Sequence, residues 1–436
     1  MTTADACVVI VLIDSERRLA LSFPYDLYGP SGSSTLGSGF RETRCNENNG
    51  GKGMKSKFAF MKSVLVFGLA TSVLPSLMLA QHYTQTNLVS NNGKAPVNDD
   101  NLQNAWGLVA SPGSPWWVSN NASGTSTLYS IDPKTGAANI VPINPPPNEF
   151  VKIPNAPGQN PPGSPTGIMF NGSPTDFLLV TGMPAVFIFV TEDGTVQGWN
   201  PGVNRASAVI VADHSKVPAA GNGAVYKGAT IAEIDGHKFI LAANFRSGRI
   251  DVFDTAFKQV RLEEEQFGDE RIPRDFAPFN VQGVGPNIYV TYAKQDAARH
   301  DPPSPGEPGD GFVDVFDSHG RLLQRLEHGN WFNAPWGVVW ATPNFGEFSN
   351  TILIGNFRGD NISAFNPVTG HFLGNMKNVD GSTLKIPGLW ALRFGNDGAA
   401  GPATTLFFTA GPDAEVNGLF GTITPSGAEK AEADEQ

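Results

Sequence analysis

Asparagine and arginine recur at matching positions in two copies of an Asn-Phe-Arg motif. The copies begin at Asn244 and Asn356 and end at Arg246 and Arg358. An arginine fork binds carboxylates bidentately, so the two arginines could recognise an acidic ligand, or they could pair with carboxylates of the protein itself. An asparagine at a strand end often hydrogen-bonds its own turn. The motif therefore leaves both a binding role and a structural role open.

Three tryptophans stand at the start of short apolar segments. They are Trp106, Trp336 and Trp390. Aromatic faces pack in protein cores, and they also stack on the CH groups of sugars. The pattern indicates core and channel packing, with a sugar-stacking platform as the alternative.

The elements that carry these residues form a sixfold repeat. Each unit opens with a short apolar strand that has glycine or a small residue near its start, and a turn and two more strands follow. Successive units start about 55–60 residues apart, which suits a four-stranded blade with loop insertions. The opening strands are AWGLVAS from Ala105, PTGIMFN from Pro165, KGATIAEI from Lys227, FNVQGVG from Phe279, PWGVVWA from Pro335 and LWALRFG from Leu389.

The repeat predicts an all-β, six-bladed β-propeller. In the second unit we expect FLLVTG from Phe177 as the second strand and AVFIFVTEDG from Ala185 as the third. The sixth unit lacks a fourth strand, and the unpaired HYTQTNLVS from His82 can supply it. Closing the ring in this way removes exposed sheet edges. A pair of β-sandwiches or a solenoid explains six copies and an orphan strand less well.

Outside the repeats, the chain carries a segment with the pattern of a secretory signal. Residues 54–80 combine a lysine-rich start with an apolar run from Val64 to Leu79 and a small residue, Ala80. A buried helix is the alternative. We expect a non-native or disordered extension (1–53, with the true start at Met54 or Met61), a signal peptide (54–80), the propeller (81–425) and a disordered acidic tail (426–436). Secretion to the extracellular space or periplasm, with no transmembrane anchor in the mature chain, follows from this division.

Composition excludes several functions. The formal net charge of the 436 residues is -11, which argues against nucleic acid or an anionic membrane as a partner. The two cysteines, Cys7 and Cys45, precede the predicted mature domain. No zinc-protease motif, phosphate-binding loop, nucleophile elbow or kinase signature is present. The sequence therefore shows no evident cofactor.

The third-strand segments NFRSGRIDVFD (Asn244–Asp254) and NFRGDNISAFNP (Asn356–Pro367) resemble those of NHL-type six-bladed propellers. The opening HYTQTNLVSN, the NAWGLV and APWGVV segments and the two NFR turns also resemble an uncharacterised family of secreted bacterial propeller proteins. This resemblance implies a propeller fold and export, and it brings no known reaction.

Propeller geometry assigns the candidate residues to one rim of the channel. Loops that enter innermost strands, and turns between second and third strands, open onto the same rim. Long insertions at 144–165, 213–228 and 293–311 fall there as well, and loops of this length are often functional. The candidate ligand-binding residues of this rim are Asn104, Trp106, Asn120, Asn244, Arg246, Tyr292, Asn333, Trp336, Asn356, Arg358 and Asp413.

Calcium is a possible cofactor, because six-bladed propellers include calcium-dependent lactonases. Oxygen ligands for such an ion could come from Asn120, Asn244, Asn356 and Asp413. A site with so few carboxylates would bind calcium weakly. His300 and Asp301 belong to an acidic insertion that offers a second set of oxygen ligands, or only a solvated loop.

The leading functional hypothesis is a secreted, monomeric binding module that recognises an extracellular glycan, peptide or protein through this rim. The first alternative is a calcium-dependent lactonase or esterase at the channel mouth. The second is a structural or surface role. The residues leave open whether the protein is an enzyme.

Overall fold

A computed structural model describes residues 82–146, 148–219, 221–261 and 267–426. The predicted extension (1–53), signal peptide (54–80) and residues 427–436 of the predicted tail lie outside this part of the chain. Within it, the only helix is a short 3-10 turn, η1 (Gly346–Phe348). The described residues include no helix with the length and apolarity to cross a membrane.

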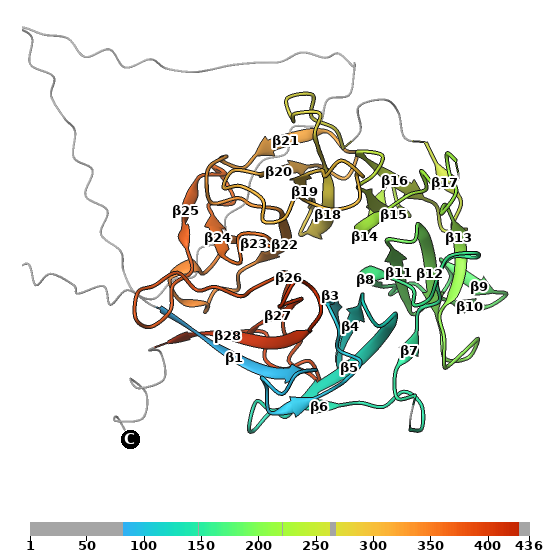
Figure 1. Ribbon diagram of the computed structural model, residues 1–436, viewed down its shortest axis with the longest axis horizontal. Helices are drawn as coiled ribbons and strands as arrows, with labels where there is room; N and C mark the ends of the chain where they lie inside the picture. The colour runs from blue at the N-terminus through green and yellow to red at the C-terminus, as the bar shows by residue number, and fades with distance from the viewer. Residues whose placement is uncertain (1–81, 147, 220, 262–266, 427–436) are drawn as a thin grey trace, which may run out of the picture. The chain divides into compact units, whose positions relative to one another are not determined.

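Six sheets of mainly antiparallel strands are arranged as blades around a central axis (Figure 1). We number the blades 1 to 6 in chain order. The innermost strands are β3 (Ala105–Val109), β8 (Pro165–Phe170), β14 (Tyr226–Ile234), β18 (Phe276–Val284), β22 (Pro335–Trp340) and β26 (Leu389–Phe394). The second strands are β4 (Trp116–Asn120), β11 (Phe187–Thr191), β15 (His237–Asn244), β19 (Asn287–Lys294), β23 (Ile352–Asn356) and β27 (Leu406–Ala410).

Two further strands complete each blade on its outer side. The third strands are β5 (Thr125–Ile131), β12 (Thr195–Trp199), β16 (Arg249–Phe253), β20 (Gly311–Phe316), β24 (Ile362–Phe365) and β28 (Leu419–Ser426). The outer strands are β6 (Ala138–Ile140), β13 (Val209–Asp213), β17 (Gln259–Val260), β21 (Leu322–Arg325), β25 (Phe372–Asn375) and β1 (His82–Ser90). Two short strands, β2 (Val97–Asn98) and β7 (Val151–Lys152), extend blades 6 and 1.

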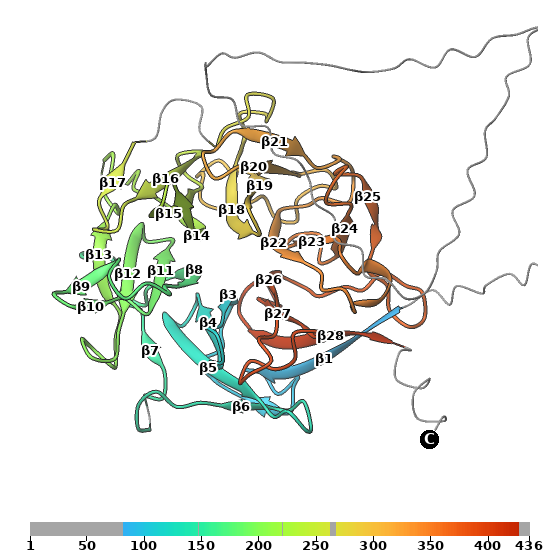
Figure 2. The same cartoon turned by 180° about the vertical axis from the view of Figure 1, so that it is seen from behind.

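The first strand of the described chain closes the ring. Strand β1 pairs antiparallel with β28, from His82 opposite Ser426 to Ser90 opposite Leu419. Both views show β1 beside β28 at the outer side of blade 6 (Figure 1, Figure 2). The Tyr83 hydroxyl, which is buried, donates a hydrogen bond to the carbonyl of Phe345 at 3.0 Å and so attaches β1 to blade 5. The structure confirms the predicted six-bladed propeller and its closing strand.

The second blade departs from the prediction. Residues Leu178–Val180 form β9, which pairs only with β10 (Met183–Pro184) in a side hairpin. Strand β11, expected as the third strand, is the second strand of the blade. The expected assignment was wrong because the apolar Leu-Leu-Val run belongs to an insertion. Its neighbour Phe177 is fully buried and packs against Phe257 of blade 3.

Apolar side chains fill the spaces between neighbouring blades. Between blades 1 and 2, for example, Trp117 stacks on Phe187 with ring centroids 4.1 Å apart. The hairpins that connect the strands use residues suited to tight turns. Asp235 and Gly236 both have positive φ, 51° and 76°, between β14 and β15, as a two-residue hairpin requires. The turn residues thus determine the hairpins within each blade, and packing against neighbouring blades stabilises them.

Innermost strands approach one another closely at small residues. A Cβ added at Gly107 would clash with the backbone carbonyl of Thr166 in blade 2. We predict that Gly107→Ala destabilises the propeller by about 1–3 kcal/mol, because backbone must move to make room. Chemical denaturation of the two proteins measures the difference.

The matched control is Gly172→Ala, whose added methyl would meet only a side chain at ordinary contact distance. This control is expected to stay within about 0.5 kcal/mol of the wild type. Equal stability of the Gly107 variant and the wild type would contradict the close approach of blades 1 and 2.

Candidate functional site

Every innermost strand has a β-bulge at the same position. The register shifts lie between Ala105 and Leu108 in blade 1 and at the equivalent places in the other five blades. A bulge changes the direction of a side chain and is common beside functional sites. The residues at this position, in blade order, are Trp106, Thr166, Lys227, Phe279, Trp336 and Trp390, and all are buried.

Four of these six residues are aromatic, and they close the channel with a floor of rings. Trp390 lies between Trp106 and Phe357, stacked on them at centroid distances of 3.5 Å and 3.8 Å. Trp336 meets Trp390 edge to face at 6.0 Å, and Phe279 lies 5.8 Å from it. We call these five rings the aromatic floor.

The two non-aromatic residues are Thr166 of blade 2 and Lys227 of blade 3, and Lys227 is a fully buried cation at a position where four blades have an aromatic ring. Its ammonium donates hydrogen bonds to Glu192 of blade 2 and, at 2.5 Å, to Asp301 in the insertion of blade 4. It also lies 5.3 Å from the centroid of the Trp106 ring, within cation–π range. Burial alone would lower the pKa of Lys227, but the two carboxylates raise it above its ordinary value.

A chain of polar contacts continues from Glu192 through blades 1 and 6 to blade 5. The Asn121 amide donates to Glu192 at 2.8 Å, and the Asn104 amide donates to Asn121 at 3.2 Å. The same Asn104 nitrogen lies 3.1 Å from Glu415, which pairs with Arg358 at 3.6 Å. These contacts run from blade 5 through blades 6, 1, 2 and 3 to blade 4.

We call this set of residues the mouth ring. Its members are Lys227, Glu192, Asp301, His300, Asn121, Asn104, Glu415 and Arg358. The ring is anchored to the aromatic floor, since the indole nitrogen of Trp390 donates to the Asn104 side-chain oxygen at 2.9 Å. A polar ring contributed by all six blades therefore lies on the aromatic floor.

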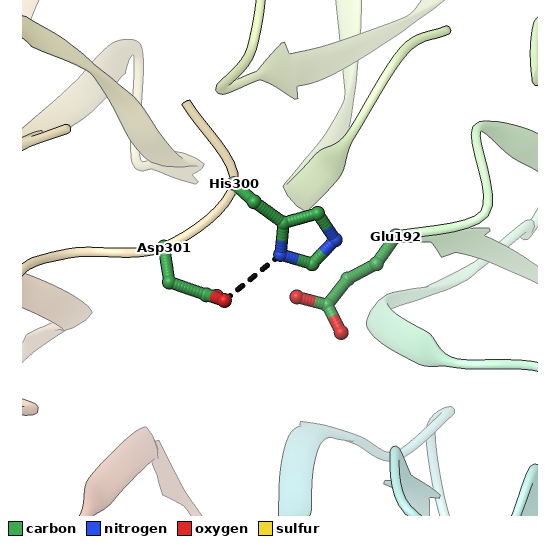
Figure 3. A group of neighbouring side chains, drawn as sticks. All are labelled: Glu192, His300 and Asp301. Atoms are coloured by element: carbon green, nitrogen blue, oxygen red, sulfur yellow. Dashed lines mark hydrogen bonds and ion pairs between the residues drawn. The ribbon is translucent and has the colours of Figure 1, made fainter. Parts of the chain in front are cut away.

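His300 orients the outer edge of the mouth ring. Its Nδ1 lies 2.9 Å from Asp301, and the two side chains and Glu192 converge on one space (Figure 3). One ligand atom from each of the three residues lies within 4.8 Å of the others, close enough to share a metal ion. The Lys227 ammonium already contacts both carboxylates, so a positive charge is built into this space.

Electrostatic coupling extends across the mouth ring. Burial raises the pKa of Glu415, and the charges of Glu192 and Asp301 add to this effect, while Arg358 and Lys227 oppose it. Burial alone would raise the pKa of Asp301, but hydrogen bonds from His300 and Lys227 hold it well below its ordinary range. Three carboxylates face two permanent cations, which leaves a formal charge of −1 when His300 is neutral.

Arg393 lies on the side of the aromatic floor that faces away from the mouth ring. Arg393 of β26 donates to the side-chain oxygen of Gln282 and reaches the carbonyls of Leu108 at 3.4 Å and Val338 at 3.5 Å. Burial lowers its pKa to about 10. The guanidinium thus crosses the channel between blades 6, 4, 1 and 5.

The structure brings four of the sequence-predicted residues together at this site. Asn104 and Arg358 belong to the mouth ring, and Trp106 and Trp336 belong to the floor. Asp413 lies at the surface, two residues before Glu415, and pairs with Lys94 at 3.2 Å.

Three predicted asparagines have structural side-chain hydrogen bonds instead. The fourth, Asn333, contributes its backbone N–H, and its side-chain oxygen is buried with no hydrogen-bond partner among the described residues. Asn120 donates to the hydroxyls of Thr125 and Thr127, both at 3.0 Å. Asn244 donates to Asp251 at 2.7 Å. The side-chain oxygen of Asn356 accepts the backbone N–H of Asn333 at 3.1 Å. The side-chain oxygens of Asn244 and Asn356, both considered for calcium, therefore accept hydrogen bonds within their own blades. The Asn120 oxygen is buried with no hydrogen-bond partner among the described residues.

Arg246 and Tyr292 line a different cavity, which lies between blades 3 and 4. Tyr292 is buried there, with its hydroxyl 3.5 Å from the carbonyl of Phe267. The two Asn-Phe-Arg motifs therefore send their arginines to different places.

Sequence reasoning missed Glu192, Lys227 and Glu415. Lys227 could have been found by aligning the six opening strands, where a lysine replaces an aromatic residue. Glu192 and Glu415 carry no such signal, because each belongs to a turn and meets the others only when the ring closes.

Comparisons with known proteins give relatives but no function. No family model matches the chain. Three uncharacterized proteins of Acanthamoeba polyphaga mimivirus are each 28% identical to it: R640 over 60% of this chain, R648 over 77% and L690 over 77%. The matched stretches cover 47%, 78% and 84% of those proteins, so the chain spans about half the length of R640. These relatives are viral, and the expected bacterial, secreted origin remains a prediction.

Solved structures with a similar arrangement include the WD40 β-propeller domain of Doa1 and a streptogramin B lyase. The first has a TM-score of 0.40 and 11% identity and covers 73% of this chain and 93% of its own. The second has a TM-score of 0.46 and 10% identity and covers 79% and 98%. Such likeness carries no argument about function.

We predict that Lys227→Met destabilises the protein at pH 7 by about 3–5 kcal/mol, because it leaves buried carboxylates without their cation. The lowered pKa of Asp301 stabilises the wild type above the ordinary Asp range, and this contribution begins to fall within that range and is lost as pH falls further toward the lowered pKa. The difference between the proteins should therefore shrink toward acid pH. Urea denaturation from pH 7 to pH 3 measures it.

Lys94→Met is the control, since Lys94 forms an exposed ion pair with Asp413. It should change stability by no more than about 1 kcal/mol at any pH. A Lys227 variant as stable as this control at pH 7 would contradict the ionic role of Lys227.

Proposed function

We propose that this protein is a secreted binding module that recognises a polar ligand at the mouth ring. The observation that carries the proposal is Lys227, a buried cation where four other blades place an aromatic ring. Packing an apolar residue at a buried position is often as stable as burying an ion pair. Four other blades place an aromatic residue at the equivalent position, so an apolar residue could also fill this position in blade 3. The buried charge of Lys227 therefore favours a role beyond stability.

The exposed part of the mouth ring favours a ligand that donates hydrogen bonds. The side chains of Asp301, His300 and Glu415 are 46%, 37% and 30% exposed, whereas Lys227 is fully covered. Carboxylate oxygens accept hydrogen bonds from hydroxyl, amide and ammonium groups. A glycan or a peptide meets this description, and Arg358 can donate hydrogen bonds to an acidic group of either.

Secretion is part of the proposal and rests on the pattern of residues 54–80. The calcium-dependent hydrolase is the less favoured alternative. It requires a cation among the mouth carboxylates, and the Lys227 ammonium already bridges Glu192 and Asp301.

The binding proposal predicts that the full chain binds a subset of glycans or peptides through the mouth ring. Glycan and peptide arrays identify the ligands, and calorimetry measures their dissociation constants. Asp301→Asn and Glu415→Gln should each weaken binding at least about tenfold, because each removes a charged acceptor. Asp235→Asn is the control, since Asp235 is 76% exposed and pairs with His319 away from the mouth. Failure to bind on both arrays, or equal binding by all variants, would reject the proposal.

The built-in cation gives a second prediction. Millimolar calcium should leave the melting temperature of the wild type unchanged, because Lys227 neutralises Glu192 and Asp301. Lys227→Ala should be stabilised by calcium, because the vacated space offers oxygen ligands without a competing ammonium. Differential scanning calorimetry with calcium, and with EGTA as control, measures both.

Stabilisation of the wild type by calcium would instead support the hydrolase alternative. A Lys227→Ala protein that is folded and indifferent to calcium would show that the carboxylates do not form a cation site.

A further inference from the structure

A second site lies apart from the mouth ring, in the cavity between blades 3 and 4. The cavity has a volume of about 1490 Å³, which exceeds the usual size of a small-molecule pocket. Its walls are the turn between β15 and β16, the linker 267–275, the insertion after β19 and the turn between β20 and β21. Residues 262–266, which precede the linker, are outside the described chain, and no part of the site is assigned to them.

Positive charge gathers on these walls. Five arginines line the cavity, against two carboxylates, Asp269 and Glu270. The arginines are Arg246, Arg271, Arg274, Arg299 and Arg321. Among the described residues that line the cavity, arginines thus exceed carboxylates by three, in a chain whose formal net charge is -11. Glu263–Glu265 precede this wall in the sequence, lie outside the described residues and are not counted.

Two of the five arginines are neutralised within the protein. Arg271 pairs with Asp269 through two hydrogen bonds, at 3.0 Å and 2.8 Å, and Arg321 pairs with Asp317 at 2.7 Å. Asp269 also receives Arg325 of β21 at 2.5 Å. Asp269 and Asp317 are thus already paired with neighbouring arginines, whereas the lining residue Glu270 forms no ion pair among the described residues.

The other three arginines have no carboxylate partner among the described residues. Arg246 donates only to the carbonyl of Gly223, at 3.0 Å. Arg274 and Arg299 are exposed and form no ion pair within the described chain. Like charges that face one concavity repel each other, and a bound anion removes that repulsion. The guanidinium fork is suited to carboxylate and sulfate groups.

The apolar side chains of the cavity help to decide whether its anionic ligand is an acidic peptide or a more polar molecule. Its aromatic members are Phe267 and Tyr292, which are buried, and Phe276, which is half-buried like the lining residues Ile272 and Leu322. None of the large exposed apolar side chains of the described chain lines the cavity. Peptide recognition usually depends on apolar anchor residues in pockets. An extended polar anion therefore fits the walls better than a peptide.

We propose that the cavity between blades 3 and 4 binds an acidic oligosaccharide, whose carboxylate or sulfate groups pair with Arg246, Arg274 and Arg299. This site is independent of the mouth ring, and either proposal can fail while the other stands.

Calorimetry on the full chain tests the site with three hexasaccharides at 50 mM and 300 mM NaCl. Oligogalacturonate carries carboxylates, a heparin fragment carries sulfates as well, and maltohexaose is neutral. At least one acidic probe should bind, more weakly at high salt, and maltohexaose should not. The double variant Arg274→Gln/Arg299→Gln should weaken acidic binding at least about tenfold with an unchanged melting temperature. Preference between the two acidic probes identifies carboxylate or sulfate as the recognised group.

The matched control is Lys134→Gln/Lys216→Gln, which removes the same charge from exposed positions in blades 1 and 2. It should bind within about twofold of the wild type. The proposal is overturned if neither acidic probe binds, if the control weakens binding as much as the arginine variant, or if hexaglutamate binds and the oligosaccharides do not. The mouth variant Glu415→Gln, in blade 6 and outside the cavity lining, should leave this binding unchanged, which separates the two sites.

Discussion

The pairing of β1 with β28 is the constraint on which the rest of the molecule depends. It joins the first described strand to the last one in a single sheet and fixes the number of blades. It also places Asn104, which follows β1, beside Glu415, which precedes β28, although 311 residues separate them. Without this strand pair, the mouth ring would be interrupted between blades 6 and 1.

The bulges in the innermost strands determine what the channel contains. Each bulge positions one side chain toward the axis, and the six residues at this position make a floor in four blades and a charged site in one. The blades are therefore similar in backbone and different in chemistry. Repetition supplies the scaffold, and a single substitution within the repeat, Lys227, creates the electrostatic centre.

Local sequence predicted the blades well because each blade is specified by short-range pattern and turn chemistry. It failed in blade 2, where Leu178–Val180 has the composition of a strand but belongs to a side hairpin. The site was less predictable. Asn104, Trp106, Trp336 and Arg358 follow from their repeat positions, whereas Glu192 and Glu415 acquire their role only through contacts between distant blades. The three asparagines at strand ends were ambiguous in sequence, because the same amide can face a ligand or its own turn.

The stacked rings of Trp106, Trp390 and Phe357 obstruct the channel, together with Arg393 on their other side. The channel is therefore a pocket that opens at the mouth ring. Because of this obstruction, a long polymer that enters the mouth can be engaged there only by its end or by a side branch. Whatever enters must also leave by the opening through which it came.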